Sequence, residues 1–377
     1  MFLGKIKNCC KYIFRERLRR MKANKAKKLL ILLMISLFFG IIATHYLENV
    51  QTRLLVSLRN KVLYNDTDSI IYEENQVIPK TRYIFTDELQ INPVSVAQSV
   101  KLYADYILDL NEKGKNHFVQ DIDEDTVSRM VQVADFFIEY AEKKQYGSLE
   151  YWLYPYKFDY HSYDEVMKAP WYSGMAQGQI IETLLASYVL TGDKSYLNAA
   201  QMSANAFYVP IEEGGVSIYL PEKDSGIWFE EYASKNTSHP MVLNGHNFAL
   251  LGLGRLIYFD DTYRFIYEQG IKALEHCLPD FDVGVWSRYD LVKYMANPKY
   301  HQIHIEQLKK LGEQNNNDLF LNYARKFTIQ KYIPLGTVYR LFFYPHNSLI
   351  AVFFINSMLF FCLCLFFVYI KELEQLN

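Results

Sequence analysis

Two uncharged apolar runs near the ends of the chain constrain its fold most strongly. The first extends from Leu29 to Leu47 and the second from Leu349 to Ile370. Each holds about 20 residues, the length that a helix needs to cross the hydrocarbon core of a membrane. We therefore predict a transmembrane helix or signal anchor at 29–47 and a transmembrane helix at 349–370. A cleaved signal peptide is the alternative for the first run, but no clear small-residue cleavage pattern follows it.

The charge that precedes the first run predicts an orientation. Residues 1–28 contain eleven Lys and Arg but one acidic residue, Glu16. Cytoplasmic flanks of membrane helices are enriched in basic residues. The sequence therefore predicts a two-pass membrane protein with both termini cytoplasmic: a basic segment at 1–28 and a tail at 371–377. Residues 48–348 would then lie in a periplasmic or extracellular space or in a Golgi-type lumen.

The composition excludes several classes of function. The formal net charge is −2, which gives no reason to expect a nucleic-acid partner. Cys277 is the only cysteine between the apolar runs, so this region has no internal disulfide. No cluster of His, Asp, Glu or Cys has the spacing of a metal site, and no GxGxxG loop is present. We expect neither a metal nor a cofactor.

Helical periodicity dominates the region from 91 to 335. Apolar residues recur at spacings of three and four in about eight segments. These segments are 92–110, 123–141, 173–190, 194–207, 247–258, 261–277, 301–312 and 318–332. They predict a mainly α fold, an α/α toroid or incomplete barrel of paired antiparallel helices. An open helical array has the same local signature.

The segments outside these helices have their own patterns. Residues 48–90 are polar and irregular and are predicted to form a stalk or lead-in to the domain at 91–335. Gly214-Gly215 followed by VSIYL predicts a short β-hairpin. The stretch 151–171 is rich in Tyr and Trp and is interpreted as an aromatic loop, one of three long loops able to build a site at one end of a toroid.

Four stretches combine aromatic, carboxylate, amide and basic side chains. They are WYSGMAQGQ at 171–179, the stretch 228–251, GVWSRYDLVKYM at 284–295 and NPKYHQIHIEQL at 297–308. Within the first, Gly174 and Gly178 are interpreted as points of close helix packing. Gln177 and Gln179 are two residues apart and do not share a helix face, so at most one of them points at a ligand.

Six motifs in this order resemble the C-terminal catalytic region of the D-glucuronyl C5-epimerase family. They are WYSGMAQGQ, LTGD…YLNAA, WFEEY, VLNG…LLGL, YDL and YHQIHIEQL, between about Trp152 and Tyr332. The resemblance implies an isomerase that converts D-glucuronate to L-iduronate residues within a heparosan- or heparan-like polysaccharide. Because some animal members are dimeric, it also implies a homodimer.

The reaction that the resemblance implies sets requirements for the site. Epimerisation at C5 removes the proton α to the carboxyl group and returns a proton to the opposite face of the ring. It needs two proton-transfer groups and donors that neutralise the carboxylate. By the resemblance, Tyr232, Tyr289 and Tyr300 fall on the family's active-site tyrosines and Glu231 falls on its carboxylate. Glu230, the neighbouring carboxylate, is interpreted as structural.

A second set of residues is predicted to bind the substrate. By the resemblance, Asn244 falls on a substrate-contacting asparagine, with a helix N-cap as the alternative, and His304 falls on a histidine near the site. The others are chosen because they lie in the motifs or close to Tyr289 and Tyr300. The full set is Asn244, Gln177, Arg288, Lys293, Lys299, His301 and His304.

The sequence departs from the family pattern at positions that concern the substrate. Animal members follow YDL with an arginine expected to hold the uronate carboxylate, but Val292 stands there, with Lys293 next. Ala233 replaces a proline, and residues 48–110 stand in place of a β-rich region. Two alternatives therefore stay open. One is a polysaccharide lyase that abstracts the same proton and then eliminates the 4-linked sugar, and the other is a non-catalytic glycan-binding subunit.

Overall fold

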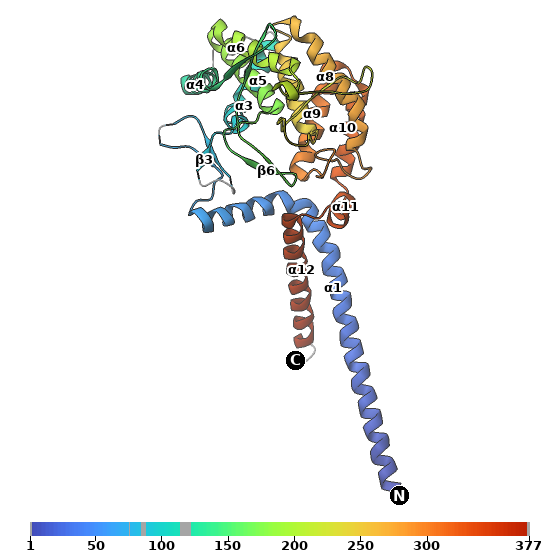
Figure 1. Cartoon of the computed structure of the whole chain (residues 1–377). Coiled ribbons are helices and arrows are strands. Elements are labelled where there is room, and N and C mark those ends of the chain that lie inside the picture. The colour runs from blue at the N-terminus through green and yellow to red at the C-terminus, as the bar shows by residue number, and fades with distance from the viewer. Residues whose placement is uncertain (1, 75, 84–87, 114–121, 375–377) are drawn as a thin grey trace. The chain divides into compact units, whose positions relative to one another are not determined.

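The computed structural model describes residues 2–74, 76–83, 88–113 and 122–374, without side chains at 2–24 and 372. The side chains of most of the predicted basic segment, and residues 375–377 of the predicted tail, lie outside this description. The chain divides into two compact units. One consists of 1–56 with 333–377, and the other of 57–332. Figure 1 labels their elements, and each unit is described by itself.

The first unit is built from apolar helices. Its elements are α1 (Phe2–Tyr64, which continues into the second unit), α11 (Leu335–Phe343) and α12 (Asn347–Glu374). Two helical segments, Lys25–Tyr64 and Asn347–Lys371, are long and apolar enough to cross a membrane. They contain both runs predicted from the sequence. Helix α1 does not end near Leu47, because no glycine or proline interrupts residues 48–64.

Buried polar groups of the first unit pair with one another. Arg340 donates to both carboxylate oxygens of Glu48, at 3.0 and 2.5 Å. The Asn356 amide donates to Thr44 Oγ1 at 3.1 Å and to Gln51 Oε1 at 2.9 Å. Polar groups removed from water need such partners, so these contacts specify how α1 meets α11 and α12.

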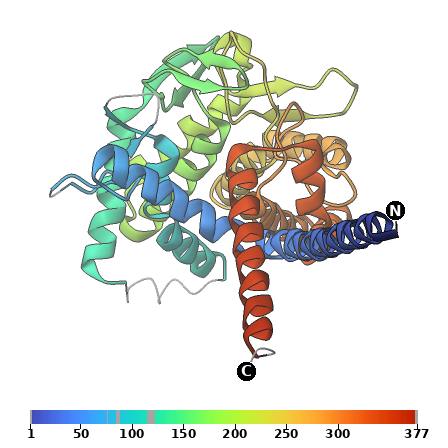
Figure 2. The same cartoon turned by 90° about the horizontal axis from the view of Figure 1, so that it is seen from below.

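The second unit is an arc of helices in two layers, an incomplete α/α toroid. The inner helices are α3 (Lys101–Glu112), α5 (Gly174–Thr191), α7 (Leu243–Leu256) and α9 (Pro298–Asn315). The outer helices are α4 (Glu124–Tyr140), α6 (Lys194–Asn205), α8 (Arg264–Cys277) and α10 (Asp318–Lys331). Each inner helix contacts the next, and each outer helix contacts the inner helix that precedes or follows it in the chain. The predicted mainly α class is confirmed; Figure 2 shows these helices from below.

Local sequence fixes where the key inner helices begin. Ser173 caps α5 by accepting from the Ala176 N–H at 3.3 Å. Asn297 caps α9 by accepting from the Tyr300 N–H at 3.0 Å. Short polar side chains at this position satisfy an N–H group that has no partner within the helix. The Asn297 cap therefore places Tyr300 in the first turn of α9, the last inner helix of the arc.

Glycines allow the two central helices to touch. A Cβ at Gly178 on α5 would collide with the backbone of Phe248, and one at Gly252 on α7 would collide with the backbone of Gly178. A Cβ at Gly174 would lie 3.0 Å from the Glu230 carbonyl oxygen. The interpretation of Gly178 as a point of close helix packing is confirmed, whereas Gly174 packs against the backbone at the end of β9.

The remaining elements of this unit are short. The strands are β1 (Ile70–Ile71), β2 (Lys80–Arg82), β3 (Leu89–Gln90), β4 (Glu142–Tyr146), β5 (Leu149–Leu153), β6 (Tyr160–Ser162), β7 (Glu165–Met167), β8 (Ser217–Tyr219) and β9 (Ile227–Phe229). The further helices are α2 (Pro93–Gln98) and 3₁₀ turns at Ala206–Tyr208, Ile211–Glu213, Asp261–Tyr263 and Leu278–Phe281. Strands β1, β2 and β3 form one antiparallel sheet in that order, and the others pair as hairpins.

Two features differ from the sequence interpretation, while one hairpin agrees with it. The hairpin predicted after Gly214-Gly215 is β8–β9. The stretch 151–171 is not a plain loop, since it holds β6–β7 and the end of β4–β5. The stalk or lead-in predicted at 48–90 divides between the two units, because 48–56 belong to the first unit and 57–90 to the second. Short pairing of two or three residues leaves too weak a sequence pattern to predict.

Candidate active site

A buried carboxylate, Glu230, shapes the backbone that carries the site. Its Oε1 accepts from the Tyr232 N–H at 3.1 Å and its Oε2 from the Met241 N–H at 2.8 Å. Burial raises its pKa, against the lowering effect of these two backbone donors. Glu230 thus ties the end of β9 to the loop before α7, which supports its interpretation as a structural residue.

Glu231 is held by two later segments. The Tyr289 hydroxyl donates to its Oε1 at 3.2 Å, and the Asn244 amide donates to its Oε2 at 3.3 Å. A Cβ at Gly245 would lie 2.6 Å from both Cβ and Oε2 of Glu231, so only glycine leaves room for the carboxylate. Burial, together with the neighbouring charge of Glu230, raises the pKa of Glu231 to about 7. Such a carboxyl group can accept or give a proton near neutral pH.

Three tyrosines predicted from separate motifs gather around this carboxylate. The hydroxyls of Tyr232 and Tyr289 are 3.3 Å apart, and the ring centroids of Tyr289 and Tyr300 are 4.8 Å apart. Burial, and then the charge of Glu231, raises the pKa of each of them. They are therefore neutral phenols that donate hydrogen bonds, and Glu231 is the group able to accept a proton.

A cavity of about 600 Å³ opens beside this cluster. Glu231, Tyr232 and Tyr300 line it. Tyr289, which donates to Glu231, is not among its lining residues. The other lining residues are Ser69, Ile70, Thr81, Tyr83, Asn92, Val94, Ser95, Gln98, Tyr156, Tyr160, Trp171, Ser173, Met175, Phe248, Lys299 and Ile303. The cavity is large enough for a sugar residue.

Sequence reasoning did not single out most of the aromatic wall of this cavity. Tyr160 stacks on Tyr232 with ring centroids 5.8 Å apart and planes 7° apart. Tyr156 stacks on Trp171 at 3.8 Å. Aromatic faces suit the C–H faces of sugars. The composition of 151–171 was the available signal for these residues, whereas Tyr83 carried none.

A hydrogen bond and an ion pair connect the tip of the β6–β7 hairpin to the YDL turn. Tyr163 donates to Asp290 Oδ2 at 3.0 Å, and Asp290 Oδ1 also accepts from the backbone of Val292 and Lys293 at 2.8 and 2.5 Å. The Lys293 ammonium lies 2.5 Å from Asp164 Oδ2. Lys293 is therefore engaged at the surface and does not line the cavity, which differs from its predicted role in substrate binding.

Two of the predicted substrate-binding residues, the histidines after Tyr300, face the core instead of the cavity. His301 bonds Ser287 Oγ through Nδ1 at 2.7 Å and the Phe327 carbonyl through Nε2 at 2.9 Å. His304 Nδ1 lies 3.0 Å from the same hydroxyl, and burial lowers its pKa well below the usual value. Successive helical residues differ by about 100° in direction, so His301 points away from Tyr300. His304 lies one turn beyond Tyr300, and its contact with Ser287 keeps it in the core.

The remaining predicted substrate-binding residues also divide into those at the cavity and those away from it. Gln177 donates to the carbonyls of Trp152 and Ser203 at 2.8 and 2.9 Å, so its amide has a structural role. Arg288 is not among the cavity-lining residues. Asn244 is the second residue of α7 and not its N-cap, and its bond to Glu231 keeps it at the site. Lys299 is the one cationic residue among the described residues that line the cavity.

Comparisons with known proteins agree with these motifs. Residues 147–329 match a family model described as the C-terminus of D-glucuronyl C5-epimerase. A D-glucuronyl C5-epimerase of Caenorhabditis elegans is 30% identical over 183 residues, which are 43% of this chain and 29% of the nematode protein. An uncharacterised protein of Methanocaldococcus jannaschii is 31% identical over 210 residues, which are 53% of this chain and 66% of that protein.

An unsaturated glucuronyl hydrolase from Bacillus sp. GL1 aligns with a TM-score of 0.37 at 9% identity, covering 76% of this chain and 84% of that one. The sequence matches cover less than two thirds of the length of both curated relatives.

Proposed function

We propose that this protein is a uronyl C5-epimerase. The premise is that residues 147–329 are a C-terminal domain of the D-glucuronyl C5-epimerase family. Its substrate would be D-glucuronate within a heparosan- or heparan-like polysaccharide. One observation carries the proposal: Glu231, with its pKa raised to about 7, faces a cavity that it shares with Tyr232 and Tyr300.

The proposed reaction begins at Glu231. Its carboxylate takes the C5 proton of the uronate, so that the C–H pair of electrons stays on the substrate as an enolate conjugated with the carboxyl group. A base works best when its pKa is near the operating pH, and the Glu231 carboxyl group meets this condition. The Tyr289 and Asn244 donors orient the carboxylate.

Tyr300 then returns a proton to the opposite face of C5. It lines the cavity from α9, an element separate from the loop that carries Glu231. After this step Glu231 holds a proton and Tyr300 has lost one. Tyr289 lies between them, 3.2 Å from Glu231 Oε1 and packed on the Tyr300 ring, and would pass the proton back through its hydroxyl. Atoms and charge are then restored without a redox partner.

Lys299 is proposed to hold the substrate carboxylate that the family arginine holds elsewhere. Val292, which stands in the arginine position, is 56% exposed, and Lys299 is the cation that lines the cavity within the described residues. We expect Lys299→Met to raise KM and lower kcat, reducing kcat/KM about 100-fold, because neutralising the carboxylate both binds the substrate and stabilises the enolate. Initial rates of hydrogen exchange at C5 measure this effect.

Lys293→Met provides the matched control for Lys299→Met. Lys293 is bonded to Asp164 outside the cavity, so its replacement should change kcat/KM less than about threefold. Equal losses in the two variants would contradict the assignment of Lys299.

Incubation of a heparosan-like polymer with the membrane-bound protein in deuterated water tests the function itself. We expect deuterium at C5, appearance of L-iduronate and unchanged chain length. Shortened chains with an unsaturated uronate chromophore would instead identify a lyase. A polymer that binds but acquires neither deuterium nor unsaturation would identify a non-catalytic subunit.

The membrane and the polymer are the proposed partners. The basic residues before the first apolar helix support cytoplasmic termini, with the catalytic unit outside the cytoplasm. Polysaccharides that have been exported, or that are modified in a lumen, would meet it there. A homodimer stays a prediction from the resemblance.

A further inference from the structure

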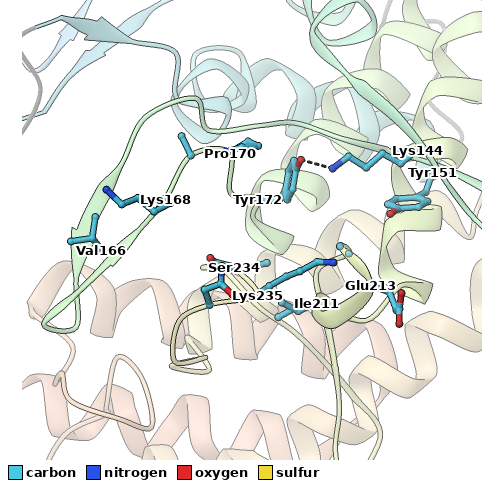
Figure 3. A pocket seen from close by; sticks show the side chains of 15 residues that line it. Lys144, Tyr151, Val166, Lys168, Pro170, Tyr172, Ile211, Glu213, Ser234 and Lys235 are labelled. Atoms are coloured by element: carbon cyan, nitrogen blue, oxygen red, sulfur yellow. Dashed lines mark hydrogen bonds between the residues drawn. The ribbon is translucent and has the colours of Figure 1, made fainter.

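A second cavity, of about 400 Å³, lies outside the proposed active site (Figure 3). Strands β4, β5 and β7 contribute residues to its lining, as do the 3₁₀ turn at Ile211–Glu213 and the loop after β9. Its lining residues are Lys144, Tyr151, Val166, Lys168, Ala169, Pro170, Tyr172, Ile211, Glu213, Gly214, Gly215, Ala233, Ser234, Lys235 and Asn236. None of them lines the first cavity.

A two-segment partition separates the two cavities. Tyr172 and Ala233 exchange backbone hydrogen bonds at 3.1 and 3.0 Å. Neighbouring side chains of extended segments point to opposite sides. Trp171 and Tyr232 accordingly line the first cavity, whereas Tyr172 and Ala233 line the second. The same backbone that presents a proposed catalytic tyrosine on one side therefore forms a wall of the second cavity on the other.

The second cavity is rich in cations. Three lysines, Lys144, Lys168 and Lys235, line it against one carboxylate, Glu213. Lys168 is paired with Asp159 at 2.6 Å, and Lys144 bonds the Tyr172 hydroxyl at 2.5 Å and is paired with Glu142 at 3.3 Å. No hydrogen bond or ion pair is found for the Lys235 ammonium among the described residues. Its charge is available to an anion that enters the cavity.

Aromatic and backbone surfaces complete this cavity. Tyr151 and Tyr172 are almost fully buried, and Lys144 lies 4.3 Å from the Tyr172 ring centroid. Gly214 has a φ of +89°, and a Cβ there would lie 3.8 Å from the Tyr151 hydroxyl and 4.0 Å from the Lys235 ammonium. Figure 3 shows Lys235 extending toward the Tyr151 side, with Lys168 at the other end. Tyrosine and lysine together suit a ring that bears an acidic group.

We propose that this cavity is a second saccharide-binding site, which holds an acidic sugar residue of the polymer away from the residue that is epimerised. The inference rests on the proposed function for the identity of the polymer. Because the partition blocks a direct path between the cavities, one chain must pass around it to fill both. Long chains would therefore bind more tightly than fragments that fill the first cavity alone.

Equilibrium binding of a fluorescent heparosan polymer to Lys235→Glu tests the site, with Lys194→Glu as the control. Both lysines are exposed, and Lys194 lies at the start of α6, outside both cavities. We expect Lys235→Glu to weaken polymer binding about tenfold, the loss of one charge-assisted contact, and Lys194→Glu to leave it within about twofold. Thermal unfolding should be the same for both, because neither ammonium has a described structural partner.

The size of the ligand and the reaction provide the deciding comparisons. A short oligosaccharide that fills one cavity should react equally well with wild type and Lys235→Glu, whereas the polymer should show a raised KM with unchanged kcat. Polymer binding that is equal in Lys235→Glu and Lys194→Glu overturns the second site, even if C5 exchange is normal. Lys235-dependent binding without any C5 exchange overturns the proposed function and leaves the second site in place.

Discussion

Replacement of Glu231 by glutamine is expected to slow C5 hydrogen exchange about 10³-fold, the usual contribution of a general base. Glutamine keeps the size of the side chain and can still accept from Tyr289, but it cannot take a proton. Exchange of deuterium into the polymer under single-turnover conditions measures the loss. Glu212→Gln, at an exposed carboxylate in a 3₁₀ turn, should exchange like wild type. Near-normal exchange in Glu231→Gln would remove this residue from the mechanism.

The same substitution has an expected signature in pH dependence. With the Glu231 pKa raised to about 7, the wild-type rate should rise as the pH increases through 7, because the protonated carboxyl group is no base. The folded protein also keeps a proton that the unfolded chain releases above its ordinary pKa of 4.5. The free energy of unfolding therefore falls as the pH rises from about 4.5 to 7, by at most about 3 kcal/mol. Above pH 7, Glu231→Gln should be more stable than wild type by part of this amount.

Replacement of Gly252 by alanine is expected to lower the free energy of unfolding of the second unit by about 3 kcal/mol or more, a severe case of overpacking. The new methyl group would meet the backbone of Gly178, which cannot turn away as a side chain can. Helices α5 and α7 would have to separate, and α7 carries Asn244 at its start. Thermal unfolding should shift downward by about 10 °C.

Gly254→Ala, two residues further along the same helix, isolates the cause. A Cβ at Gly254 would lie 3.4 Å from the Tyr267 ring, which is an ordinary contact. Alanine is favoured over glycine within helices by about 1 kcal/mol, so this variant should be as stable as wild type or slightly more stable. If both variants were destabilised equally, helix separation would not explain the Gly252 result.

The order of the motifs predicted that residues far apart in the sequence would lie together. Glu231, Tyr232, Tyr289 and Tyr300 come from three motifs, and the fold brings them within hydrogen-bonding or ring-packing distance. The mainly α class followed from periodicity, which depends on many residues at once. The catalytic roles of Glu231 and the three tyrosines are still predictions.

The surroundings of the site were less predictable for physical reasons. His301 lies next to Tyr300 but one step around the helix, which turns it toward Trp286 at a ring distance of 3.7 Å. Tyr83 reaches the cavity from a small sheet whose strands are two or three residues long, too short for a recognisable pattern. Closeness to Tyr300 in the sequence wrongly suggested a site role for His301. The long-range strand pairing near Tyr83 left no pattern in the sequence.

The uncharged partners of Glu231 have a consequence for how the enzyme would respond to its compartment. Its hydrogen bonds come from a phenol and an amide, so a uronate that enters brings a second negative charge near the first. Binding of the anion and uptake of a proton then become linked equilibria. Acidification would favour occupancy by the polymer, whereas alkalinity would favour proton abstraction. Under the proposed function, the acidity of the surrounding fluid would then affect the extent of conversion.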